Sequence, residues 1–223
     1  MLTLRLDCII GYVNSETAAD IGTDHGYVAV ELIKNARAKR VIASDVRQGP
    51  LNADISNIKK NNMEDRIETR LGSGLSILRK GEADTAVIAG MGGELICDII
   101  EKDIEIARSL TLVIQPMNSQ YELRKYLINN GFTIEKEDIE CEGDRVYNIL
   151  IVKNGEQKGF REDIEYHIPL YLKDNEKFDA LFNKKKREFS KIISGLEKSE
   201  NCDIIKLNYY KERLKSLEGM VNG

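Results

Sequence analysis

The feature that most constrains the fold of this chain is a repeated alternation of short apolar runs and helical patterns. The apolar runs occupy residues 17–21, 40–44, 66–70, 85–90 and 110–115, and a helical pattern follows each of them. Strands that alternate with helices form a parallel sheet whose faces those helices cover. After Gly131, extended runs at 132–140 and 145–154 flank the turn sequence CEGD and predict a hairpin. The expected fold class is α/β, with five parallel strands and a C-terminal β-hairpin.

The remainder of the chain has a different pattern. From about Lys158 no strand pattern occurs, and Lys and Glu dominate. One stripe consists of Phe178, Phe182, Lys185, Phe189, Ile192 and Leu196, and a second consists of Leu207, Tyr210, Leu214 and Leu217. Such spacings are typical of helices that pack on each other. We expect a sheet domain at 1–155 and an α-helical coiled-coil hairpin at 158–223, which is either a structural appendage or a substrate-binding arm.

The composition excludes several classes of protein. With 33 Lys+Arg against 37 Asp+Glu, the net charge is −4, so a polyanionic partner would need a local basic patch. Four widely spaced cysteines and two histidines predict no metal site and a reducing compartment. The opening MLTLRLDCII lacks the apolar core of a signal peptide, and no apolar run reaches the ~18 residues of a membrane span. We expect a cytoplasmic monomer without membrane contact.

Polar residues and glycines follow four of the predicted strands. The segment ADIGTDHGY (19–27) follows the first strand, and Asp45 ends the second. LGSG (71–74) follows the third, and AGMGG (89–93) ends the fourth. Open parallel sheets bind ligands beyond the carboxyl ends of their strands. These four segments therefore predict one ligand site at one edge of the sheet.

Each segment alone also has an ordinary structural explanation. A glycine turn with an acid about twenty residues later occurs in many sheets that bind no nucleotide. Asp24 and His25 could simply cap the following helix, and LGSG could be a plain turn. The three glycines of AGMGG are harder to explain by packing, because they cost chain entropy without adding to a core. The functional interpretation depends on all four segments meeting at one edge.

The first loop disfavours a dinucleotide. The dinucleotide fingerprint G-x-G-x-x-G keeps its middle position free for a pyrophosphate, but here Asp24 occupies that position. A carboxylate would repel a pyrophosphate. It suits S-adenosylmethionine, which has an adenosine, a cationic sulfonium and no phosphate. Asp45 stands where a carboxylate commonly holds the two hydroxyls of a ribose.

With these motifs in order, the chain resembles the bacterial tRNA (adenine(22)-N1)-methyltransferases, a family of Rossmann-like class I enzymes that use S-adenosylmethionine. The resemblance runs over about residues 1 to 155, through RL at 5–6, ADIGTDHGY, GP at 49–50, RLGSGL, IAGMGGELI, QP at 115–116 and VYNILIV. The helical tail is similar in kind to the family's coiled-coil appendage. Two positions depart from the family's pattern. Ser73 stands where Asp is frequent, and Met117 where Asn is usual, with Asn118 one step later.

The resemblance implies methyl transfer to N1 of an adenine in the D-arm region of tRNA. N1 is unprotonated near neutral pH, so the enzyme must position it, extract the base from its stack and stabilise growing positive charge. Asp24 is the catalytic candidate, since a carboxylate there can accept a hydrogen bond from the exocyclic amine. The implied cofactor contacts are Asp20, Gly22, His25, Gly26, Asp45, Gly72, Ser73, Gly90, Met91 and Gly92. The implied substrate contacts are Tyr27, Gly93, Gln115, Pro116 and Asn118.

A basic run in the helical segment is the candidate for tRNA binding. The expected contacts are Lys184, Lys186 and Arg187, because Lys185 belongs to the apolar stripe. Further positive side chains on the sheet domain are Arg37, Lys39 and Arg40. A lysine run on a helix is usually a solvated face. Two alternatives stay open: methyl transfer to another RNA base or a small molecule, and a non-catalytic adenosine-sensing protein.

Overall fold

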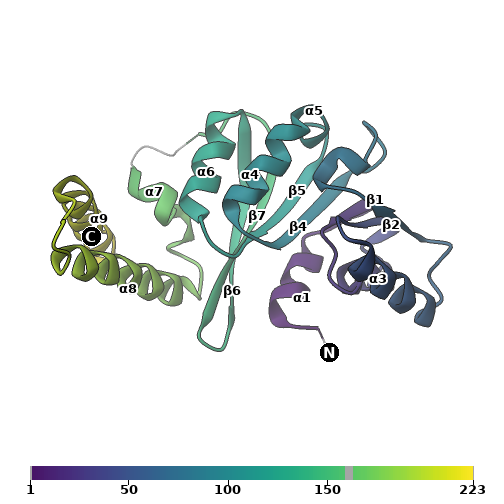
Figure 1. Ribbon diagram of the computed structural model, residues 1–223, viewed down its shortest axis with the longest axis horizontal. Helices are drawn as coiled ribbons and strands as arrows, with labels where there is room; N and C mark the ends of the chain where they lie inside the picture. The colour runs from purple at the N-terminus through teal and green to yellow at the C-terminus, as the bar shows by residue number, and fades with distance from the viewer. Residues whose placement is uncertain (1, 159–162, 223) are drawn as a thin grey trace.

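The computed structural model describes residues 2–158 and 163–222 and is built around one seven-stranded sheet (Figure 1). The strands are β1 Ser15–Ile21, β2 Ala38–Asp45, β3 Ile67–Leu71, β4 Thr85–Met91, β5 Thr111–Pro116, β6 Phe132–Glu142 and β7 Arg145–Asn154. Their order across the sheet is β3-β2-β1-β4-β5-β7-β6. Strands β1 to β5 pair in parallel, and β7 pairs antiparallel with both β5 and β6. The predicted α/β fold class is confirmed.

Helices cover both faces of this sheet. They are α1 Leu4–Gly11, α2 Tyr27–Lys34, α3 Gln48–Lys60, α4 Gly93–Lys102, α5 Ile104–Ala107, α6 Gln120–Asn129, α7 Asp163–His167, α8 Phe178–Glu197 and α9 Ile204–Asn222, with short 3-10 turns at Gly74–Ile77 and Leu170–Leu172. One core cluster includes Ile96 of α4 and Leu123 of α6, and the other includes Ile9 of α1, Leu32 of α2 and Ile58 of α3. Burial on both faces explains the apolar runs of the central strands, such as residues 86–89 of β4 and 112–114 of β5.

Helix α1 is an element that the sequence pattern did not predict. The side chain of Thr3 accepts a hydrogen bond from the Leu6 amide at 3.4 Å, and this cap fixes where the helix begins. Ile9 and Ile10 are buried against the sheet. The helix is short, so its apolar face repeats too few times to stand out as a period. Its position matters because its first turn reaches the ligand pocket described below.

Helices α8 and α9 form the predicted helical hairpin and pack on the end of the β6–β7 hairpin (Figure 1). The buried positions of α8 differ in part from the predicted stripe. Leu181 and Ile193 are buried, whereas Phe182 and Ile192 are only half-buried. The reason is that α8 rests on the β-hairpin as well as on α9, so its buried face is wider than a two-helix seam. The predicted domain division near 155–158 adjoins residues 159–162, which lie outside the described residues, and it stays a prediction.

A buried ion pair joins the sheet to residues 166–171, which lie in the first part of the arm (residues 158–223). Arg124 of α6 and Glu137 of β6 are both completely buried and pair through two guanidinium nitrogens. Arg124 Nη1 also donates to the Tyr166 carbonyl at 2.8 Å. The Tyr171 hydroxyl donates to Glu137 Oε2 at 2.9 Å, and the Asn148 amide donates to Oε1 at 2.8 Å. Every charged group in this cluster therefore has hydrogen-bond partners inside the protein.

A second polar cluster fixes α7 and α9 against α6. Asp163 accepts hydrogen bonds from the hydroxyls of Tyr121 at 2.7 Å and Tyr209 at 2.6 Å. The ring of His167 stacks on Tyr121 with centroids 4.3 Å apart, and its Nε2 lies 2.9 Å from the Tyr209 hydroxyl. Burial lowers the pKa of His167 to about 3, so its imidazole is neutral near pH 7. We name these two clusters together the arm junction.

Candidate functional site

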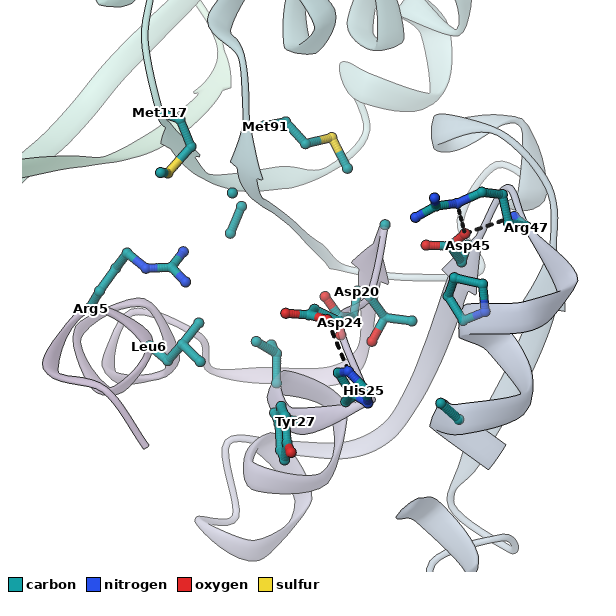
Figure 2. Close-up of a pocket in the computed structure, with 17 residues that line it drawn as sticks. Arg5, Leu6, Asp20, Asp24, His25, Tyr27, Asp45, Arg47, Met91 and Met117 are labelled. Carbon is teal, nitrogen blue, oxygen red and sulfur yellow. Dashed lines mark hydrogen bonds and ion pairs between the residues drawn. The ribbon is translucent and has the colours of Figure 1, made fainter. Parts of the chain in front are cut away.

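A pocket of about 600 Å³ opens at the carboxyl ends of β1, β2 and β4 (Figure 2). This is the edge at which the four polar segments were predicted to meet. The predicted residues that line it are Asp20, Gly22, Asp24, His25, Tyr27, Asp45, Gly90 and Met91. The other lining residues are Arg5, Leu6, Thr23, Val28, Arg47, Pro50, Ala53, Ala89 and Met117. The volume is in the range of pockets that hold small ligands and cofactors, about 300–1,000 Å³.

Gly22 and Met91 meet at the floor of the pocket. Gly22 has a φ of +69°, and a Cβ there would lie 2.1 Å from the Cε of Met91. A side chain at position 22 would therefore strain the backbone, and it would also displace the flexible end of the Met91 side chain. The left-handed φ is the stronger reason for a glycine here.

Hydrogen bonds hold the β1–α2 loop over the next strand and helix. The Thr23 amide donates to the Ser44 carbonyl at 2.8 Å, and the Asn57 amide group donates to the His25 carbonyl at 2.8 Å. His25 itself has a φ of +53°, which is uncommon for a residue with a side chain. The loop is thus fixed while the Asp24 carboxylate, whose side chain is 94% exposed, projects from its tip and lies 3.7 Å from His25 Nε2.

Asp45 is oriented by the turn that follows it. Its Oδ1 accepts the Arg47 amide at 2.7 Å, and the Arg47 Nε lies 3.8 Å away. The Asp45 side chain is 11% exposed, and the residue lines the pocket. One oxygen is thereby anchored to backbone, and the carboxylate is presented to the pocket in a fixed direction.

Two aspartates beside the pocket are buried with oxygens that lack a hydrogen-bond partner. Oδ2 of Asp20 has none within the protein, and neither oxygen of Asp54 has one. Burial raises the pKa of Asp20 from its ordinary 3.8 to about 7, with repulsion from Asp54 adding to the shift. Burial likewise raises the pKa of Asp54 to about 6. Unsatisfied buried carboxylates are rare and mark a place where a cationic or hydrogen-bonding ligand is expected.

Arg5 enters the pocket from α1, on the side away from Asp45 and Arg47 (Figure 2). Its Nη1 donates to Gln115 Oε1 at 2.6 Å, and Gln115 is completely buried. The Gly90 amide donates to the same oxygen at 3.3 Å. Gln115 was predicted as a substrate contact, but it does not line the pocket and instead contacts three residues that do, Arg5, Gly90 and Met117.

The other predicted residues of the sheet domain lie outside the pocket lining. They are Gly26, Gly72, Ser73, Gly92, Gly93, Pro116 and Asn118. Gly26 packs over Asp54, and Gly93 is buried where a Cβ would lie 2.5 Å from the Ser119 carbonyl. Pro116 is buried at the end of β5, while Ser73 is exposed and Asn118 lies at the surface beside Gly92. Their assigned contacts stay predictions, and for Gly93 close packing of the β5–α6 loop explains the glycine.

Several lining residues were missed by sequence reasoning. Arg5 and Leu6 come from the unpredicted helix α1, and Arg47 follows the strand end that Asp45 marks. The motifs RL at 5–6 and GP at 49–50 carried the family resemblance, but no role was assigned to them. Thr3 as a helix cap before an apolar run was a usable sequence signal for α1.

The basic run of α8 lies apart from this pocket. Lys184 donates to the Val146 carbonyl at 2.9 Å, and Lys186 pairs with Glu218 at 2.8 Å. Lys185 is buried in the stripe and pairs with Glu188 at 2.7 Å. Arg187 is exposed. Residues 184–187 therefore contain fewer positive side chains that are available to a ligand than the sequence suggested.

His, Cys, Asp and Glu side chains of 2–158 and 163–222 form no group of three or more that could hold a metal ion. Along the same residues, none of the helices has the length and the apolar character needed to cross a membrane.

The model of a known protein family, described as "Methyltransferase domain", matches residues 2–150. The chain belongs to this family. The methyltransferase domain thus comprises the whole of α1 and nearly all of the seven-stranded sheet, including every residue that lines the pocket. The arm lies beyond the match.

Individual relatives agree with the resemblance predicted from the motifs. A tRNA (adenine(22)-N(1))-methyltransferase of Bacillus subtilis is 33% identical over 159 residues, which cover 70% of this chain and 66% of the relative. The crystal structure of the B. subtilis M1A22 tRNA methyltransferase TrmK matches with a TM-score of 0.88, at 25% identity and 99% coverage of both chains. A Streptococcus pneumoniae putative tRNA (m1A22) methyltransferase in complex with S-adenosyl-L-methionine matches with a TM-score of 0.86 and 26% identity, also over 99% of both chains. The similarity in fold thus extends over the arm.

Proposed function

We propose that the chain transfers the methyl group of S-adenosylmethionine to N1 of an adenine of tRNA, at the position that the relatives' names give as 22. The observation that carries this proposal is the pocket, where Asp45 is fixed at one side and Asp20 and Asp24 lie at the centre. The relatives described above support the choice of cofactor and substrate.

The residues present fit S-adenosylmethionine better than a phosphate-bearing cofactor. Asp45 can accept from both ribose hydroxyls, since one of its oxygens is already anchored and its direction is fixed. The orphaned Oδ2 of Asp20 and the exposed carboxylate of Asp24 favour cationic groups over phosphates. When bound, this cofactor supplies a methyl group on a positively charged sulfur.

Asp24 is the group that we place beside the reacting adenine. Its side chain lines the pocket and is 94% exposed, so a base extracted from RNA can reach the carboxylate from solvent. There it accepts a hydrogen bond from the exocyclic amine, which becomes more acidic as N1 gains positive charge. Tyr27 is 49% exposed, with its ring centroid 5.7 Å from that of His25, and the two rings offer a stacking surface for the base.

The arm is the part that we expect to hold the rest of the tRNA. Arg187 is exposed, and Lys186 and Lys184 need to release only a surface ion pair and a carbonyl contact to reach phosphates. Surface ion pairs contribute about 0–1 kcal/mol, so their exchange for a phosphate contact is inexpensive. In this proposal residues 158–223 bind the tRNA, and residues 1–155 bind the cofactor and transfer the methyl group.

Methylation of a tRNA transcript with labelled S-adenosylmethionine, followed by nucleoside analysis, tests the proposal. We expect 1-methyladenosine, and no labelling of a matched transcript with guanosine in place of the target adenine. The Asp24→Asn variant should keep cofactor affinity within about tenfold and lose roughly two orders of magnitude in turnover. A different methylated nucleoside would exclude N1 of adenine as the acceptor. Normal turnover of Asp24→Asn at saturating cofactor would exclude the role of Asp24.

A further inference from the structure

We propose that a groove beside the ligand pocket binds the base of a nucleotide that adjoins the target adenine in the RNA. The groove lies between the β5–α6 loop and the arm and has a volume of about 320 Å³. This is at the small end of the range of ligand pockets, about 300–1,000 Å³, so the groove has room for one base. The assignment rests on the proposed function, because it takes an RNA as the substrate.

The groove connects the ligand pocket to the arm. Met117, which is 43% exposed, lines both the groove and the pocket. The arm contributes Lys184 and Lys185, the first residues of the basic run of α8. In Figure 1, α6 is the helix of the sheet domain that lies next to α7 and the arm. An RNA strand that places an adenine beside Asp24 and a phosphate on α8 therefore passes this groove.

The charges of the groove offset one another. Lys184 and Lys185 contribute two positive side chains. Glu122 and Glu188 contribute two negative ones, and Glu188 pairs with Lys185 at 2.7 Å. His167 also lines the groove, and burial lowers its pKa to about 3, so its ring is neutral near pH 7. Such a wall attracts a phosphate little and suits an uncharged base, while the exposed part of the basic run remains for phosphates.

Most of the remaining lining is apolar or aromatic. These side chains are Met117, Tyr121, Phe189, Ile192 and Tyr210. RNA bases that leave their stack bind on aromatic side chains and present their edges to polar groups. The side-chain amides of Asn118 and Gln120 also line the groove, and neither has a hydrogen-bond partner among the described residues. Each amide carries both donors and an acceptor, so the two can pair with the edge of a base.

The loop that carries these amides is fixed to a strand that lines the ligand pocket. The Met117 amide donates to the Met91 carbonyl at 2.8 Å, and the Gly93 amide donates to the Asn118 carbonyl at 3.2 Å. Met91 ends β4 and lines the pocket. A base held by this loop is therefore held at a set distance from the pocket, which positions the neighbouring adenine for methyl transfer.

The test removes the base from the RNA and, separately, fills the groove. The substrates are a tRNA transcript and two copies of it with an abasic nucleotide immediately before or immediately after the target adenine. Gln120→Trp places a bulky ring in the groove from α6, and Ile192→Trp does so from α8. Asn129→Trp is the matched control, because Asn129 is exposed at the other end of α6 and outside the groove lining. Thermal melts and calorimetric titration of S-adenosylmethionine check the folding and the cofactor affinity of each variant.

We expect one of the two abasic transcripts to lower kcat/KM of the parent chain by about 10- to 100-fold. Each groove-filling variant should lower kcat/KM for the intact transcript by a similar factor. On that abasic transcript it should lose less than about threefold more, because the base and the tryptophan occupy the same space. Asn129→Trp should behave as the parent does, and cofactor affinity should stay within about threefold in every variant.

Full activity of both groove-filling variants on the intact transcript would overturn the assignment. So would a parent activity that is equal on all three transcripts, or losses that multiply when a filled groove meets the abasic transcript. If the parent methylates no adenine of the intact transcript, the proposed function itself fails.

Discussion

The ligand pocket and the arm junction both bury charged side chains, but the Arg124–Glu137 pair of the junction is satisfied within the protein, whereas the buried acids of the pocket are not. At the junction, Arg124 and Glu137 pair with each other. Arg124 also donates to the Tyr166 carbonyl of α7, and Glu137 also accepts from the Tyr171 hydroxyl. Around the pocket, Asp20 and Asp54 are equally buried and keep oxygens without a partner. Five of the seven such orphaned side-chain atoms among the described residues belong to Asp20, Thr23, Ser44 and Asp54.

This difference separates two uses of buried polarity. A satisfied cluster adds specificity to packing and needs nothing from outside. An unsatisfied cluster lowers the stability of the ligand-free protein. Such a cluster is kept where a bound ligand supplies the missing hydrogen bonds or charge. The comparison predicts that changes at the pocket act on ligand binding and changes at the junction act on folding.

The largest expected effect is on cofactor affinity at Asp45. Asp45→Ala removes the carboxylate that we expect to accept two hydrogen bonds from the ribose hydroxyls, each worth about 1.5–3 kcal/mol. Calorimetric titration of S-adenosylmethionine should show a loss of about 100-fold or more, while the unfolding free energy changes little. Asp45→Asn, which keeps the shape of the side chain, is the control and should fall between. An unchanged dissociation constant for Asp45→Ala would remove the ribose assignment.

The next effect is on stability at the junction. Arg124→Met leaves the carboxylate of Glu137 buried without its cation, which should cost about 3–5 kcal/mol in the free energy of unfolding. Urea denaturation measures this change. The double variant with Glu137→Met should regain a large part of it, since both charges are then gone. A loss below about 1 kcal/mol in the single variant would contradict the contrast between the two regions.

A smaller effect concerns salt dependence. Changing Lys184, Lys186 and Arg187 together to Gln should weaken tRNA binding and lower the slope of log affinity against log salt by about three at most. Cofactor affinity should not change. The matched control replaces three exposed lysines of the sheet domain, Lys59, Lys60 and Lys80, by Gln. If both triple variants bind tRNA as the parent does, the α8 run is a solvated face.

The last effect is a pH dependence of stability that comes from Asp20. Its pKa is raised above the ordinary value of 3.8 to about 7, so the folded state holds a proton that the unfolded state has released between these values. The stability of the ligand-free chain therefore falls as pH rises through this interval, and Asp20→Asn should flatten the slope.

Ligand binding should show the opposite trend at the same residue. A cationic sulfonium favours ionised Asp20, so affinity for S-adenosylmethionine should rise a few-fold between about pH 6 and pH 8. S-adenosylhomocysteine lacks the sulfonium charge and should show a weaker trend. Equal trends for the two ligands would show that Asp20 does not sense the charge on sulfur.

The sequence predicted the sheet because its strands are buried on both faces. Residues 86–89 are all apolar, and the ten-residue helix α4 follows the strand that contains them. The same reasoning could not give the arm junction. Arg124 and Glu137 are polar residues in amphipathic elements. The periodicity of a sequence does not indicate which residues of two distant elements contact each other. Contacts between distant segments decide that.

The site was predicted in the same uneven way. Strand ends were located by glycines and acids, so Asp20, Asp24 and Asp45 could be placed on one edge. Arg5 could not, because it depends on how a short N-terminal helix folds back over β5 and β7. Glycines were also ambiguous. Gly22 provides a left-handed backbone turn in the pocket lining, whereas Gly93 makes room for the β5–α6 loop.

The buried pair of Arg124 and Glu137 also has a consequence for how the chain is made. A ribosome synthesises both residues well before it reaches the carbonyl of Tyr166 and the hydroxyl of Tyr171, which complete their hydrogen bonds. A nascent chain that stops short of residue 171 therefore carries an ion pair whose late partners do not yet exist. Its sheet reaches full stability only after the segment that leads to the arm has emerged. Stalled or truncated products of this protein should accordingly be preferred substrates for cellular proteases, even when the whole ligand pocket has already been synthesised.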